Sequence, residues 1–137
     1  MKRKFAIIWT VIIICVLIAA FTIIKIISNS QANLEQLADL QIQNVDLTKI
    51  SDGVYTGSYS AFPISVKVKV TVSNHKITKI ELIKHSNGQG APAEIIPDRV
   101  REAQSLDVDI VSGATYSSKI ILKSIENALN NAGDINH

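Results

Sequence analysis

Residues 107–118 read Asp-Val-Asp-Ile-Val-Ser-Gly-Ala-Thr-Tyr-Ser-Ser, a short apolar run that passes into small and hydroxyl-bearing residues. In the residues that follow, Ile121, Ile125 and Ala128 recur at helical spacing and predict a helix with one apolar face. The hydroxyl cluster therefore lies where a loop becomes a helix N-terminus, which exposes unpaired N–H groups and the positive end of the dipole. This geometry suits a phosphate, and Gly113 and Ala114 would let a ligand approach the backbone closely.

A plainer interpretation of the same stretch is that Ser112, Thr115 or Ser117 only caps the helix. Capping requires one such residue and stabilises a helix by about 1 kcal/mol. The stretch is neither a Walker loop nor a GxGxxG sequence, so it carries no standard nucleotide signature. The residues alone leave both interpretations open.

Asp109, three residues before Ser112-Gly113-Ala114-Thr115, together with Ser117 and Ser118 after it, closely resembles the flavinylation motif of FMN-binding domains. That family includes the peripheral subunits of the Rnf and Na⁺-translocating quinone reductase complexes and small membrane-anchored extracytoplasmic flavoproteins. The resemblance implies FMN as the cofactor, held by a phosphoester bond to Thr115, with the backbone after Gly113 near the phosphate. It also implies a separate flavin transferase that moves FMN from FAD with Mg²⁺, and a role for Asp109 in that attachment.

The resemblance extends over roughly residues 52–129 and assigns further contacts. The hydroxyls of Ser112, Ser117 and Ser118 would contact phosphate or ribityl oxygens. A loop at 85–92 is similar to the His-x-Asn-Gly-x-Gly segment of small family members, which places His85, Asn87 and Gly88 near the flavin. Without the resemblance, this loop is an ordinary polar connection.

The N-terminal part of the chain is a candidate membrane anchor. Met1-Lys2-Arg3-Lys4 is basic, and no further charge occurs until Lys25. The 20 residues from Phe5 to Ile24 would span a hydrocarbon core of about 30 Å. The basic end predicts a cytoplasmic N-terminus with the remainder on the extracytoplasmic side. A cleaved signal peptide is the alternative, although its apolar region is usually shorter, about 7–15 residues.

The rest of the chain predicts an α+β fold, an antiparallel β-meander with C-terminal helices packed on it, preceded by the single N-terminal transmembrane helix. Residues 64–72 alternate β-branched apolar residues with Ser, Lys, Lys and Thr, the clearest strand in the chain. A second strand is expected at 54–60. A third is expected at 77–84, where a change of apolar phase suggests a bulge or burial on both faces. Pro97 begins a predicted helix to residue 104.

These features divide the chain into a cytoplasmic tip and anchor (1–27), a juxtamembrane linker (28–49), an FMN-binding domain (50–133) and a short tail (134–137). Of 14 basic residues, four (Lys2, Arg3, Lys4 and Lys25) belong to the anchor, so the remainder carries a net charge of −2. No basic patch or aromatic platform suggests nucleic acid. Cys15 is the single cysteine, which excludes an intrachain disulfide.

No nucleophile–base pair, catalytic residue or metal cluster stands out, so any redox chemistry would belong to the cofactor. The favoured function is a membrane-anchored, extracytoplasmic FMN protein that carries electrons between a membrane donor and an unknown acceptor, more a carrier than an enzyme with its own turnover. One alternative is a module that binds FMN or another phosphate-bearing ligand reversibly, as a sensor or accessory subunit. A third possibility is a tethered interaction domain without cofactor.

Overall fold

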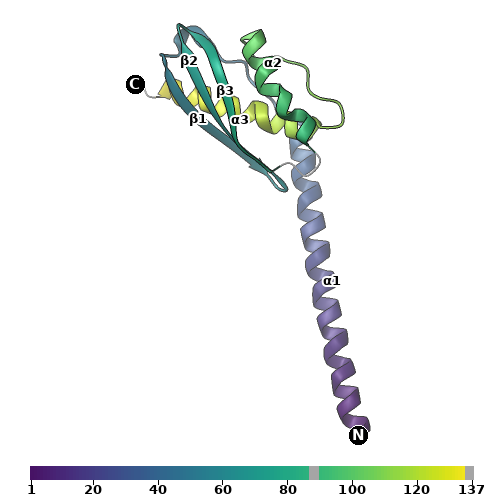
Figure 1. The fold of residues 1–137 in the computed structure, drawn as a ribbon. Helices are drawn as coiled ribbons and strands as arrows, with labels where there is room; N and C mark the ends of the chain where they lie inside the picture. Colours follow the sequence, from purple (N-terminus) through teal and green to yellow (C-terminus); the bar gives the residue numbers. More distant parts are fainter. Residues whose placement is uncertain (87–89, 135–137) are drawn as a thin grey trace. The chain divides into compact units, whose positions relative to one another are not determined.

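The computed structural model describes residues 1–86 and 90–134, apart from the side chains of residues 29–34 and 133–134. The chain forms two compact units, Met1–Asn33 and Leu34–His137. In chain order the elements are α1 (Lys2–Ala38), η1 (Leu47–Lys49), β1 (Gly53–Ala61), β2 (Ile64–Ser73), β3 (Lys76–Ser86), η2 (Ala91–Ile95), α2 (Ile96–Ala103) and α3 (Thr115–Asp134). Figure 1 labels the α-helices and the strands.

The first unit consists of most of α1. Within the described residues, the stretch Lys2–Ser28 is the one helical segment long and apolar enough to cross a membrane, and none of it is buried inside the chain. Its length and apolar composition are those of a membrane span, and an N-terminal signal sequence shares them. The predicted apolar helix is therefore present, and its role as an anchor stays a prediction.

The second unit contains a three-stranded antiparallel sheet in the order β1-β2-β3, as the alternating pattern predicts. A tight turn joins β2 to β3, and its residues Asn74 and His75 both adopt positive φ angles, of 52° and 58°. The register between β2 and β3 shifts between Lys67 and Val68 and again between Thr71 and Val72. These two bulges account for the change of apolar phase in the third strand.

One face of the sheet is covered by α3, which packs against β1 and β2, while α2 packs against β3 (Figure 1). Every second residue of β2 points to α3 and is fully buried, as Val66, Val68 and Val70 show. From α3, Ile121 and Ile125 fill the same core. The predicted meander with C-terminal helices is thus confirmed, and the hydrophobic core lies between the sheet and these helices.

The segment predicted as a linker contributes to this core. Leu37, at the end of α1, and Ile50 are 1% and 2% exposed. The Lys119 ammonium of α3 donates to the backbone carbonyls of Leu37 and Ala38, the last residues of α1. The compact unit therefore begins at Leu34, and the boundary of the functional domain at residue 50 remains a prediction.

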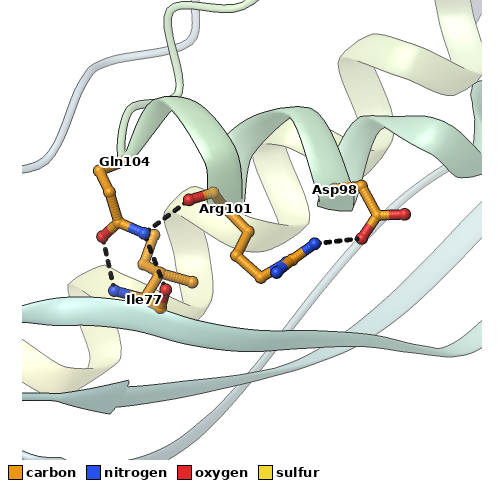
Figure 2. A network of polar contacts seen from close by, with 4 residues as sticks. All are labelled: Ile77, Asp98, Arg101 and Gln104. Atoms are coloured by element: carbon orange, nitrogen blue, oxygen red, sulfur yellow. Dashed lines mark hydrogen bonds and ion pairs between the residues drawn. The ribbon is translucent and has the colours of Figure 1, made fainter.

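The side chain of Gln104 forms hydrogen bonds with the outer edge of β3. Gln104 follows α2 in a left-handed conformation, with φ 53°. Its amide accepts from the backbone N–H of Ile77 and donates to the Ile77 carbonyl, both at 2.8 Å, and it also donates to the Arg101 carbonyl (Figure 2). The amide thus pairs with β3 as a neighbouring strand would, and it fixes the end of α2 where the chain turns toward residues 107–118.

Candidate functional site

Side chains of Arg99 and Asn44 form hydrogen bonds with the backbone of the segment that precedes the hydroxyl cluster. Arg99 of α2 donates from Nη1 to the Asp109 carbonyl at 2.7 Å. Earlier in the segment, the backbone N–H of Leu106 donates to Asn44 Oδ1 at 3.1 Å, and the Leu106 side chain is buried. The Asp109 carboxylate belongs to an exposed residue. The approach to the cluster is therefore fixed by its backbone and leaves the Asp109 side chain toward solvent.

A tight turn then leads into α3. The Ala114 N–H donates to the Val111 carbonyl at 3.0 Å, which places Ser112 and Gly113 at the two central positions. Gly113 has a φ angle of 80°, the value that a type II turn requires at its third residue. A Cβ built at Gly113 would meet no atom within 4 Å, so glycine is required here by the backbone angle and not by packing. Ser112 and Gly113 are both exposed.

Ser118 fastens this turn to the helix. Its hydroxyl donates to the Ala114 carbonyl at 2.8 Å and accepts from the Val111 N–H at 3.1 Å. Ser118 is fully buried, and Ser117 is 2% exposed. The Ser118 hydroxyl therefore has a structural role in the turn. The predicted contacts of Ser117 and Ser118 with a ligand stay predictions.

Ala114 occupies the position that caps α3. Its carbonyl accepts from the Ser118 N–H at 2.9 Å, the first hydrogen bond of the helix, and Thr115 is the first helical residue. Alanine has no side-chain acceptor, so this helix lacks the hydroxyl or carboxylate cap that proteins favour. Among the described residues, neither Ser112 nor Thr115 makes a side-chain hydrogen bond that would replace it. The half-buried Thr115 hydroxyl is thus not consumed by the fold.

Two surface hollows adjoin the segment that leads into the turn, and they share Asp107, Val108 and Ile110. One, of about 660 Å³, is also lined by Arg99, Glu102, Ala103 and Asp109. The other, of about 320 Å³, is also lined by Ile42, Asn44, Leu106, Lys119 and Leu122. Both volumes fall in the range of small-molecule sites, roughly 300–1,000 Å³. Open space of this size therefore adjoins residues 107–110, which lead into the turn.

His85 lies at the end of β3, and its side chain is 4% exposed. Its Nδ1 atom is 3.0 Å from Glu94 Oε1, which belongs to η2. The described partner of His85 is therefore a carboxylate of the next element and not a residue of the turn. Asn87 and Gly88, the other two predicted loop contacts, lie outside the described residues.

The structure thus brings together Asp109, Ser112, Gly113, Ala114, Thr115, Ser117 and Ser118 at the start of α3. It also adds residues that the sequence pattern did not indicate. Arg99 reaches Asp109 from ten residues earlier, and Asn44 reaches Leu106 from 62 residues earlier. Neither residue stands in a motif, so only the three-dimensional arrangement reveals them.

Comparison with known proteins matches a longer stretch of the chain that includes the turn. The family model described as the FMN-binding domain matches residues 62–130, half of the chain. The chain is 38% identical over 96 residues to the NADH:acrylate oxidoreductase of Vibrio harveyi, and 28% identical over 107 residues to an uncharacterized protein of Treponema pallidum (strain Nichols). These alignments cover 68% and 72% of this chain, but only 10% and 28% of the two relatives.

A similar fold occurs in the crystal structure of the CPE2226 protein from Clostridium perfringens, with a TM-score of 0.51. The alignment covers 62% of this chain and 90% of that one, at 24% sequence identity. This likeness concerns the fold alone.

Proposed function

The chain belongs to the FMN-binding domain family, and from this premise we propose that it carries FMN covalently on Thr115 and transfers electrons on the extracytoplasmic side of a membrane. Flavin binding and a redox role agree with the family and with a relative named as an oxidoreductase. That relative is about ten times longer than the shared region, so its own substrates are not carried over. The covalent bond and the membrane location are the specific parts of this proposal.

The observation that carries the proposal is the position of Thr115. It is the first residue of α3, next to a capping position held by Ala114, and its hydroxyl has no structural hydrogen bond among the described residues. A threonine retained only as a cap would stand one residue earlier and would bond to the helix N–H groups. A hydroxyl that is near the positive end of the helix dipole suits a phosphoester, because the dipole stabilises the remaining phosphate charge.

The surrounding residues fit a phosphate-bearing group. Gly113 leaves open space where a side chain would project, and the exposed Ser112 lies beside it in the turn. Ser118 keeps the turn in place through Val111 and Ala114, so the backbone N–H groups that follow Gly113 are held at the helix start. FMN, when bound, supplies the electron-accepting and electron-donating chemistry, and the chain supplies its position.

Attachment would require a second protein. In the proposed step, Thr115 loses its hydroxyl proton and its oxygen forms a bond to the FMN phosphorus, while the pyrophosphate bond of FAD breaks and AMP leaves. A flavin transferase with Mg²⁺ would catalyse this exchange. In this proposal the carboxylate of Asp109, an exposed residue whose backbone carbonyl accepts from Arg99, would contact that enzyme or its metal.

The stretch Lys2–Ser28 supports the membrane location, with the N-terminus in the cytoplasm because Lys2, Arg3 and Lys4 precede the apolar run. The folded unit would then lie on the extracytoplasmic side. A membrane donor would reduce its flavin, and a separate acceptor would reoxidise it. A covalent bond has a physical advantage there, since a flavin that dissociates from an exposed site is lost by dilution.

The test is the intact mass of the full chain purified from membranes of its own host, with a denaturing gel viewed for flavin fluorescence. We expect a mass increase of one FMN less one water, fluorescence that survives denaturation, and the loss of both in Thr115→Ala. Thr56→Ala is the matched control, because it makes the same substitution at an exposed threonine of β1 outside the turn and should keep the added mass. The same mass also shows whether the first 28 residues are retained.

Two other outcomes would contradict the covalent carrier. A yellow protein that releases its flavin on denaturation would indicate the reversible binding module. A colourless protein, made in a host that demonstrably modifies another flavinylated protein, would leave the turn as a structural element only. Covalent flavin that persists in Thr115→Ala would move the attachment to another residue.

A further inference from the structure

The face of the sheet opposite α3 is exposed and polar. Residues that point to this side come from all three strands, and we call them the open sheet face: Val54, Thr56, Ser58, Ser60, Ser65, Lys67, Lys69, Thr71, Ser73, Lys76, Lys79, Glu81 and Lys84. Lys67, Lys79 and Lys84 are exposed, and Lys69 is half-buried. The face thus presents hydroxyls and ammonium groups where α3 covers the opposite face with apolar side chains.

Positive charge on this face is only partly neutralised. Glu81 receives a hydrogen bond from Lys79 at 2.9 Å, and the pKa of the Glu81 carboxyl is lowered first by this bond and charge, and further by Lys69. Lys67 and Lys84 stand directly opposite each other in the β2–β3 register. Like charges at such positions destabilise a sheet, so the pair is explained more readily by an external anion than by folding.

The charge of the second unit is strongly divided. It contains ten basic and twelve acidic residues, a net charge of −2. The open sheet face, with five lysines and one glutamate, carries +4, so the remainder carries −6. Residues 91–134, which contain the turn and the helices that follow the sheet, include seven acidic and four basic residues, a net charge of −3. Five of these carboxylates precede the turn, namely Glu94, Asp98, Glu102, Asp107 and Asp109. An anionic surface would therefore attract the open sheet face and repel the side that bears the turn.

We propose that the open sheet face rests on the anionic phospholipid headgroups of the membrane that anchors α1. The inference depends on the proposed anchoring, because a tether keeps the face near headgroups at a high effective concentration. Clusters of lysine near a membrane surface bind acidic lipids electrostatically. Val54 is the one exposed apolar residue of this face, too little for insertion, so the contact is mainly ionic. In this orientation Thr115, at the start of α3, stays on the solvent side of the sheet.

The experiment uses the full chain reconstituted into vesicles of phosphatidylcholine alone, or of phosphatidylcholine and phosphatidylglycerol in equal amounts. Each lysine is acylated with an uncharged reagent and quantified by peptide mass spectrometry. We expect Lys67, Lys69 and Lys84 to react roughly fivefold more slowly on the acidic vesicles. Lys49, which is 82% exposed and lies outside the face, should react at similar rates on both. High salt should remove the difference.

Charge reversal provides the matched comparison. Lys67→Glu with Lys84→Glu should abolish the protection of Lys69, whereas Lys49→Glu with Arg101→Glu, an equal change of net charge outside the face, should preserve it. Equal acylation of Lys69 on both vesicles would overturn the proposal even if flavin were attached to Thr115. If alkaline carbonate extracts the chain from the vesicles, the chain has no transmembrane anchor and the proposal fails. This result does not test the attachment of flavin to Thr115. Protection that requires host proteins instead of acidic lipid would assign the face to a protein partner and also refute the proposal.

Discussion

The amide of Gln104 pairs with both backbone polar groups of Ile77, accepting from the N–H and donating to the carbonyl at 2.8 Å each (Figure 2). An edge strand exposes such groups to water or to another chain. Here a single side chain at the end of α2 satisfies them, and the same amide donates to the Arg101 carbonyl. The position of α2, and with it the start of the segment that approaches Thr115, depends on this contact.

Replacement of Gln104 by alanine should destabilise the junction of α2 and β3. The variant leaves a part-buried donor and acceptor of Ile77 without partners, which costs about 1–3 kcal/mol. Hydrogen exchange of the Ile77 amide in the full chain should accelerate correspondingly. The control is Arg101→Ala, which breaks an exposed pair with Asp98 at 3.3 Å and should change stability by about 0.5 kcal/mol or less. Equal effects of the two variants would refute the assigned role of Gln104.

Replacement of Ser118 by alanine should loosen the turn before α3 and leave the helix intact. The Val111 N–H and the Ala114 carbonyl lose their shared partner, and the part-buried N–H costs about 1–2 kcal/mol. Amide exchange at Val111 should increase, and flavin attachment should slow because Thr115 is less well placed. Ser117→Ala, at a neighbouring buried serine, tests the specificity. If both variants slow attachment equally while Val111 exchange is unchanged, the serines act on the ligand and not on the turn.

Much of the fold could be predicted from local patterns. The alternation in β2 indicates its buried valines, and the apolar phase change in β3 reports the two bulges. The docking of Leu37 and Asn44 could not be predicted, since their partners lie 82 and 62 residues away and leave no local period. The role of the Ser118 hydroxyl at the start of α3 could not be predicted from the sequence either. In a sequence, a hydroxyl that braces a turn looks the same as one that contacts a phosphate.

The Glu81 carboxyl on the open sheet face should titrate below its ordinary pKa, chiefly because Lys79 donates a hydrogen bond to it. A lowered folded-state pKa stabilises the protein above the unfolded value, and the contribution disappears as the pH falls through the folded value. Lys79→Gln should raise the pKa of Glu81 in a carboxyl NMR titration, while Lys76→Gln, at the start of β3, should leave it nearly unchanged. A Glu81 pKa that does not respond to Lys79→Gln would contradict the described ion pair.

Replacement of Gly113 by alanine should produce a folded chain with a strained turn. A Cβ has open space there, so the cost comes from the φ angle of 80° alone, about 1–2 kcal/mol for a residue with a side chain. Flavin attachment should fall, and Gly113→Asn should retain more of it, because asparagine tolerates positive φ better than alanine does. Unfolding of the full chain, followed by circular dichroism, measures the first effect. Complete loss of the folded state would show that Gly113 has a packing role that the structure does not contain.

At Gly57, unlike at Gly113, glycine is required by close packing and not by the backbone angle. A Cβ at this position of β1 would overlap the backbone carbonyl oxygen of Ser124 and the backbone nitrogen of Ala128 in α3. Neither atom can move unless the helix shifts, so Gly57→Ala should separate α3 from β1 and destabilise the protein by more than about 3 kcal/mol. A matched substitution, Ser58→Ala, adds no atom and should be nearly neutral in the same unfolding measurement. A Gly57→Ala variant as stable as Ser58→Ala would mean that α3 does not lie as close to β1 as described. If Gly57→Ala unfolds readily while Gly113→Ala only weakens flavin attachment, the close packing of α3 and the geometry of its first turn are separable requirements.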